Sequence, residues 1–75
     1  MNLKQLFQKI DSEGGAPSAK PLLQKLIKRG EAGFPMAHKQ ARNQIDSATL
    51  LKLGFALWED GVLTVNPQVI EELRH

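Results

Sequence analysis

The segment from Leu53 to Pro67, LGFALWEDGVLTVNP, constrains the fold more than any other part of the chain, because it admits two incompatible structures. In one, two strands flank a tight turn at Glu59-Asp60-Gly61. In the other, a helix ends at Gly61 and a single short strand follows. The segment contains the only Trp of the chain, so the choice also decides where the largest apolar side chain lies.

The spacing of the apolar residues favours the helix. At a period of 3.6 residues, one broad arc collects the apolar side chains, and polar or small residues fill the remainder. The arc consists of Leu50, Leu51, Leu53, Gly54, Phe55, Leu57 and Trp58. At a period of two residues no polar face forms. We therefore predict a helix over 47–59, capped by Asp46-Ser47, and a strand over 62–65.

Local signals place the first helix. Asn2 and Gln5 have the spacing of a capping box, in which each side chain bonds the backbone of the other. Leu3, Leu6, Phe7 and Ile10 then recur at helical spacing. The pair Gly14-Gly15 is a helix breaker. We expect this helix to end there.

The remaining elements follow from similar signals. A second helix is expected from Ser18 to Gly30, with a proline in its first turn, where a missing N–H costs little. A strand of two or three residues is expected around Phe34, and a third helix over 37–44. A final helix is expected to begin at Pro67, after an asparagine cap.

These elements predict a single domain over 1–75 that is mainly α with a minimal two-strand element. Residues 1–15 are expected to form an added arm on a core over 18–75. A four-residue strand is not stable alone, so the segment around Phe34 is the expected partner of strand 62–65. The expected core consists of Leu6, Phe7, Leu22, Leu23, Leu26, Ile27, Leu50, Leu53, Leu57, Trp58, Leu63 and Ile70.

The absence of cysteine excludes disulfides and thiolate metal sites and suits a reducing compartment. No apolar run approaches the roughly 20 residues of a membrane span, and the first residues lack the apolar core of a signal peptide. We therefore expect a cytoplasmic protein without a membrane partner.

From Leu22 to Val65 the expected order is helix, strand, helix, helix, strand, and this order resembles the winged-helix, or helix-turn-helix, superfamily. The phrase SATLLKLGFALWEDGVLTV is similar to its recognition helix and first wing strand. The matching positions are Ser47, Leu50, Leu57, Gly61, Val62 and Leu63. The resemblance implies a winged-helix-like small domain and DNA binding. The sequence departs from the superfamily pattern in two ways. Asn66-Pro67 ends the strand where a second wing strand usually follows, and the outward face of helix 47–59 has few basic side chains that could bind phosphate.

Charge is unevenly distributed along the chain. Residues 20–45 hold six cations and one carboxylate, a net charge of +5, whereas residues 46–75 hold two cations and five carboxylates, a net charge of −3. One interpretation is a surface for DNA on the basic segment 20–42, because lysine and arginine bind phosphate without reading sequence. The candidate residues are Lys25, Lys28, Arg29, His38, Lys39, Arg42 and Asn43. The other interpretation is a solvated surface that serves solubility.

The residue pattern offers no catalytic constellation. The two histidines, His38 and His75, stand outside any nucleophile motif. Metal-ligand spacing and phosphate-binding glycine motifs do not occur. The GxxG of residues 30–33 has the form of an RNA-clamping loop, but the following Pro35 argues against the helix that such a loop requires. We therefore expect no enzyme, no cofactor, no metal and no small-molecule substrate.

Two functions remain. The leading hypothesis is a non-enzymatic DNA-binding or DNA-associated regulatory module. The alternative is a protein–protein interaction module, such as an adaptor, an inhibitor or a complex subunit, that binds a partner or a second copy. Its contact surface would be the apolar helix 47–59, with Leu51, Phe55 and Trp58 as interface residues, or the free edge of strand 62–65. Both remain open, as does the possibility that the terminal helices cover this surface.

Overall fold

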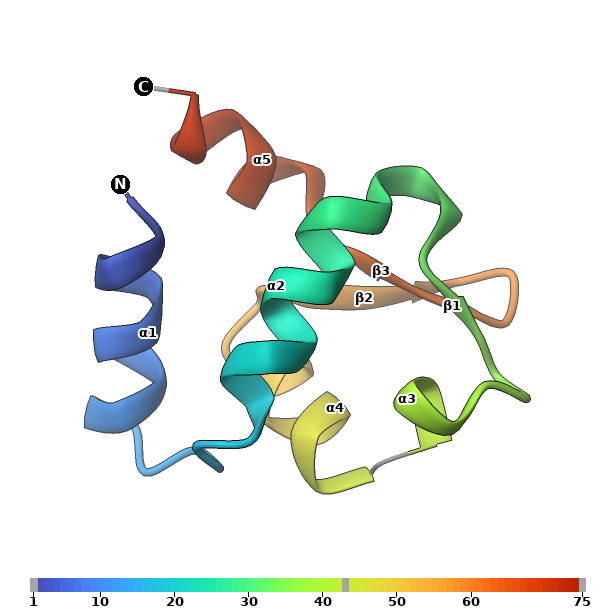
Figure 1. Cartoon of the computed structure of the whole chain (residues 1–75), viewed down its shortest axis with the longest axis horizontal. Helices are drawn as coiled ribbons and strands as arrows, with labels where there is room; N and C mark the ends of the chain where they lie inside the picture. The colour runs from blue at the N-terminus through green and yellow to red at the C-terminus, as the bar shows by residue number, and fades with distance from the viewer. Residues whose placement is uncertain (1, 43, 75) are drawn as a thin grey trace.

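The structure is a computed structural model and describes residues 2–42 and 44–74. Helices surround a small antiparallel sheet (Figure 1). In chain order the elements are α1 (Leu3–Ser12), α2 (Ala19–Arg29), the 3-10 turn η1 (Gly30–Ala32), β1 (Phe34–Pro35), α3 (Lys39–Arg42), α4 (Gln44–Lys52), β2 (Ala56–Glu59), β3 (Val62–Val65) and α5 (Pro67–Leu73). The predicted class, mainly α with a minimal strand element, is confirmed, and the sheet has three strands rather than two.

The predicted helix over 47–59 is wrong, because α4 stops at Lys52. Gly54 has φ +77°, its N–H donates to the Leu51 carbonyl at 3.1 Å, and the Phe55 N–H donates to the Leu50 carbonyl at 2.9 Å. This pair of bonds is a Schellman motif, which needs a residue in the left-handed conformation just after the helix. A glycine at position 54 therefore ends the helix before the chain reaches Phe55.

The residues after Gly54 form a hairpin, the reading that the apolar spacing disfavoured. Asp60 and Gly61 have φ +51° and +77°, and they connect β2 to β3 directly. Two consecutive residues with positive φ make a turn whose twist matches that of paired strands, and Asp-Gly suits it. Trp58 pairs with Leu63 across this hairpin, and Ala56 pairs with Val65.

The expected cap at Asp46-Ser47 is also wrong, since both residues lie inside α4 and are buried. The helix begins earlier, at Gln44, and the helix expected over 37–44 is shortened to α3 at 39–42. The Ser18 hydroxyl at the start of α2 donates to the Asp46 carboxylate. Asp46 therefore joins two helices rather than beginning one.

The sheet has the order β1-β3-β2, so β3 is the central strand. The predicted partnership with the segment around Phe34 is confirmed, because Phe34 pairs with Leu63. Strand 62–65 is correctly placed, but it does not offer the free edge expected of it, since β1 and β2 flank it. Within the described residues, the outer edge of β2 pairs with no other strand.

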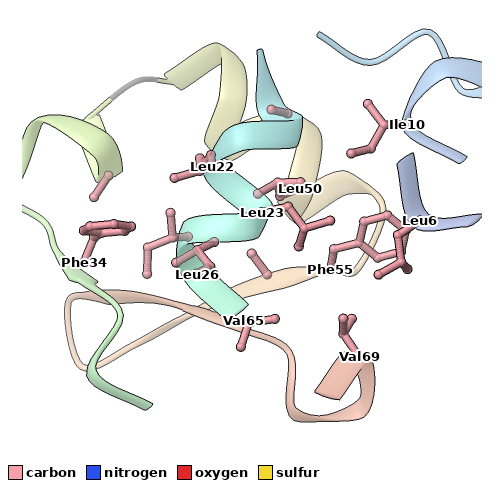
Figure 2. Packing of buried hydrophobic residues seen from close by; sticks show 14 residues of the cluster. Leu6, Ile10, Leu22, Leu23, Leu26, Phe34, Leu50, Phe55, Val65 and Val69 are labelled. Carbon is pink, nitrogen blue, oxygen red and sulfur yellow. The ribbon is translucent and has the colours of Figure 1, made fainter. Parts of the chain in front are cut away.

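The core lies between α2, α4 and the sheet. Figure 2 shows Leu22, Leu23 and Leu26 of α2 at its centre, with Phe34 toward one end and Leu6 and Ile10 of α1 at the other. Among the expected core residues, Leu6, Leu22, Leu23, Leu26, Leu50 and Leu63 are buried, and Phe7, Ile27, Leu53 and Ile70 pack partly buried against them. The expectation is wrong for Trp58, of which 39% is exposed, and for Leu57, which is half-buried and lies outside the core cluster.

Several local expectations are confirmed. Asn2 and Gln5 form the capping box of α1, with bonds of 2.8 and 2.9 Å in the two directions. Gly14 has φ +71° and follows the end of that helix. The Asn66 side chain accepts the Gln68 N–H at 3.0 Å and caps α5, which begins at Pro67. No helix within residues 2–42 and 44–74 has the length and apolar character needed to cross a bilayer.

Candidate interaction surface

The structure divides the basic residues predicted to bind nucleic acid between two helices. Lys25 and Lys28 lie on the exposed face of α2, and Lys39 and Arg42 lie on the exposed face of α3. α2 packs on α4 and β3, whereas α3 packs on α4 and β1. Asn43, the seventh candidate, lies outside the described residues.

Arg29 and His38 instead support β1. The Arg29 Nε–H donates to the Gly33 carbonyl, and its guanidinium carbon lies 4.6 Å from the centre of the Phe34 ring. The His38 ring lies 4.7 Å from the same ring, and its Nδ1 accepts the Gln40 N–H at 3.1 Å. Both side chains are therefore held by contacts within the chain.

Lys20, another cation of the basic segment, forms an ion pair with Asp11 of α1 at 2.8 Å. The segment charge of +5 therefore overstates what this part of the surface presents. The cations left for an external partner are fewer than the sequence indicates, and they lie in two separate groups.

A groove of about 720 Å³ lies between α3, α4, β2 and the turn after β1. We call it the α3–α4–β2 groove. Its lining is largely apolar, contains one cation and, among the described residues, contains no carboxylate. The lining residues are Met36, Ala41, Arg42, Gln44, Ser47, Ala48, Leu51 and Trp58. In Figure 1, α3 and α4 lie next to each other on one side of the sheet.

Large apolar side chains are exposed at this groove. Met36 is 61% exposed and Trp58 is 39% exposed, and both line it. Ile45 of α4 is 71% exposed and lies three residues before Ala48, a spacing that places both on one side of the helix. The same stripe continues to the exposed Lys52, which lines a separate hollow together with Glu13. The outward side of α4 is therefore apolar at its start and basic at its end.

Two of the three predicted interface residues, Leu51 and Trp58, line the groove. Phe55 does not, because it is buried in the core at the end of the Schellman motif. Met36 and Ile45 were missed. Ile45, which follows the helix expected over 37–44, lies in the first turn of α4 and faces solvent.

Three carboxylates line a second hollow of about 770 Å³ between η1, α5 and the sheet, which we call the acidic hollow. Its lining includes Glu31, Glu59 and Glu71, with Arg74 as the only cation among the described lining residues. Successive strand residues point to opposite faces of a sheet. Trp58 therefore lines the α3–α4–β2 groove while its neighbour Glu59 lines the acidic hollow.

Neither hollow contains a set of metal ligands. Within residues 2–42 and 44–74, no three His, Asp or Glu side chains are grouped closely enough to hold a metal ion. Comparison with known proteins identifies no matching family model, no matching curated protein and no matching solved structure. Any functional conclusion therefore depends on the surface itself.

Proposed function

We propose that this chain is a non-enzymatic protein-interaction module that binds its partner in the α3–α4–β2 groove. The observation that carries the proposal is the exposure of Met36 and Trp58, which both line the groove, together with the exposed Ile45, which is next to the lining residue Gln44 in the chain. Exposed apolar side chains scattered singly are ordinary, whereas a group of them on one surface marks an interaction site.

The residue types at the groove support this proposal. Tryptophan, methionine and arginine are enriched at protein interfaces, and carboxylates and lysines are depleted at interface cores. Met36, Arg42 and Trp58 all line the groove. Trp58 offers a large rigid ring at little cost in conformational entropy, and such side chains often contribute most of the binding energy.

DNA binding is the second candidate, and the order of the elements favours it. The order α2, β1, α3, α4, β2, β3 resembles that of a winged helix, in which α4 would correspond to the recognition helix and the β2–β3 hairpin to the wing. Lys52 ends α4, and Lys39 and Arg42 lie on α3, which packs against α4. Against this candidate, Glu59 and Asp60 at the hairpin would repel phosphate, and a fold alone does not imply a function.

The experiment that tests the proposal is a selection of random 16-residue peptides displayed on phage against the full chain. Enriched peptides are then measured against Ile45→Glu, which places a charge beside the groove, next to the lining residue Gln44, and against Gln24→Glu, a matched control on the exposed face of α2. Ile45 is 71% exposed in the first turn of α4, so a carboxylate there leaves the core intact and suits the helix dipole.

The proposal requires peptides that bind the wild-type chain and the Gln24 variant but not the Ile45 variant. A selection without such peptides would refute it. In parallel, fluorescence anisotropy with mixed-sequence duplex DNA tests the second candidate. Binding whose log K falls with log salt at about −0.9 per neutralised phosphate, and that Lys39→Ala/Arg42→Ala abolishes, would favour DNA instead.

A further inference from the structure

The distribution of charge around the α3–α4–β2 groove identifies the kind of partner that fits it. Arg42 lines the groove, and Lys39 lies three residues earlier on the same side of α3. The described part of α3 and α4 contains one carboxylate, Asp46, which is buried and accepts the Ser18 hydroxyl. It therefore presents little negative charge to a molecule in the groove.

The nearest strand carboxylate is also turned away. Glu59 follows Trp58 in β2, but it lines the acidic hollow together with Glu31 and Glu71. Among the described residues, the groove is thus lined by one cation and apolar side chains, whereas three carboxylates line the acidic hollow. Complementary potentials select partners and suppress wrong ones, because like charges brought together across an interface are costly.

We infer that the groove binds an acidic amphipathic helix of another protein, with apolar residues at i, i+3 or i+4, and i+7 and with carboxylates along its flank. This inference rests on the proposed function and specifies its partner. Apolar residues at that spacing form one stripe of a helix that can contact Met36, Leu51 and Trp58, which is the helix-in-groove mode of recognition. The flanking carboxylates then lie near Lys39 and Arg42.

The test uses the peptides whose binding the Ile45→Glu substitution abolishes. Their sequences are expected to show an excess of Asp and Glu and the helical spacing of apolar residues. Their affinity for Lys39→Glu/Arg42→Glu is expected to fall roughly tenfold, with a weaker fall at high salt. The matched control is Lys25→Glu/Lys28→Glu on α2, which changes the net charge by the same amount outside the groove and is expected to leave the affinity nearly unchanged.

Three outcomes would overturn the inference while leaving the proposed function in place. In the first, groove-dependent peptides lack the acidic excess or the helical spacing. In the second, both charge-reversed variants lose affinity equally, which would show that the net charge of the chain, and not the groove, determines the affinity. A dimer in sedimentation that Ile45→Glu dissociates would assign the groove to a second copy. A selection that yields no groove-dependent peptide would overturn the proposed function, and the inference with it.

Discussion

Substitution of Gly33 by Ala is expected to destabilise the fold through a steric overlap that a neighbouring glycine allows us to isolate. Gly30 is the first residue of η1 and Gly33 follows its last, and the two share an unusual backbone conformation, with φ/ψ of 59°/−131° and 52°/−154°. This region is essentially restricted to glycine. A Cβ at Gly30 would meet open space, whereas a Cβ at Gly33 would overlap the Leu63 carbonyl oxygen and lie 2.8 Å from Thr64 Cγ2.

The magnitude follows from these two terms. The backbone conformation costs a non-glycine residue about 1–3 kcal/mol, and this cost applies to both positions. At Gly33 the overlap involves the backbone of the central strand, which cannot move aside by rotating a side chain, so overpacking adds about 1–3 kcal/mol. A domain of this length has a total stability of only about 4–11 kcal/mol. Gly33→Ala is therefore expected to remove roughly half of it.

Urea unfolding at 25 °C provides the measurement, followed by circular dichroism at 222 nm and by the fluorescence of the single tryptophan. Gly30→Ala is the matched control. Both variants should unfold at lower urea than the wild type, and Gly33→Ala should be less stable than Gly30→Ala by about 1–3 kcal/mol. Equal losses of stability in the two variants would refute the reasoning, because the overlap of a Cβ at Gly33 with the backbone of β3 would then have no energetic cost.

Three further substitutions test the packing by the same measurement. Leu50→Ala should cost about 2–5 kcal/mol, because Leu50 is fully buried between α2 and the sheet; a loss below 1 kcal/mol would contradict that burial. Trp58→Ala should cost less than the roughly 3–5 kcal/mol of a buried tryptophan, and a larger loss would show that the Trp58 side chain is buried in the core. Asn2→Ala should cost about 0.5–2 kcal/mol through the lost capping box, and Gln8→Ala, on the exposed face of the same helix, should leave stability nearly unchanged.

Elements with strong local signals were predictable from the sequence. The capping box at Asn2 and the glycines after Ser12 specify where α1 begins and ends, and Asn66-Pro67 specifies the start of α5. In each case the cap satisfies backbone groups with side chains a few residues away, so distant parts of the chain have little influence. The partnership of β1 and β3 followed from a different argument, the need of a short strand for a neighbour.

The hairpin was not predicted, because periodicity is a weak signal where a segment is apolar on both faces. β2 contains only one charged residue, Glu59, so an arc on a helical projection fits it as well as a pleated strand. The structure is decided instead by backbone conformation: Gly54, Asp60 and Gly61 all have positive φ. These three positions end the helix and form the turn, and Asp-Gly is a hairpin signal that outweighs the spacing of the apolar residues.

That one error also accounts for the incorrect assignments at the candidate site. On a continuous helix, Phe55 and Trp58 lie three residues apart on the same face, so both would be buried or both exposed. In the structure Gly54 separates both residues from α4. Phe55 is buried in the core, where its N–H donates to the Leu50 carbonyl at the end of the helix, whereas Trp58 lies on β2 at the groove. The surface that supports the proposed function exists only because the helix ends at Lys52.

The net charge of each sequence segment was also an incomplete guide to the charge on the folded surface. The counts of +5 and −3 assign each charge to a segment, whereas the fold assigns it to a face of the molecule. Trp58 and Glu59 are neighbours in sequence and line opposite hollows, and Arg29 and Lys20 belong to the basic segment but are engaged by Phe34 and Asp11. What a partner meets at the groove is therefore a small set of cations around apolar anchors. This arrangement favours an acidic amphipathic helix over the extended phosphate backbone that the segment charge indicated.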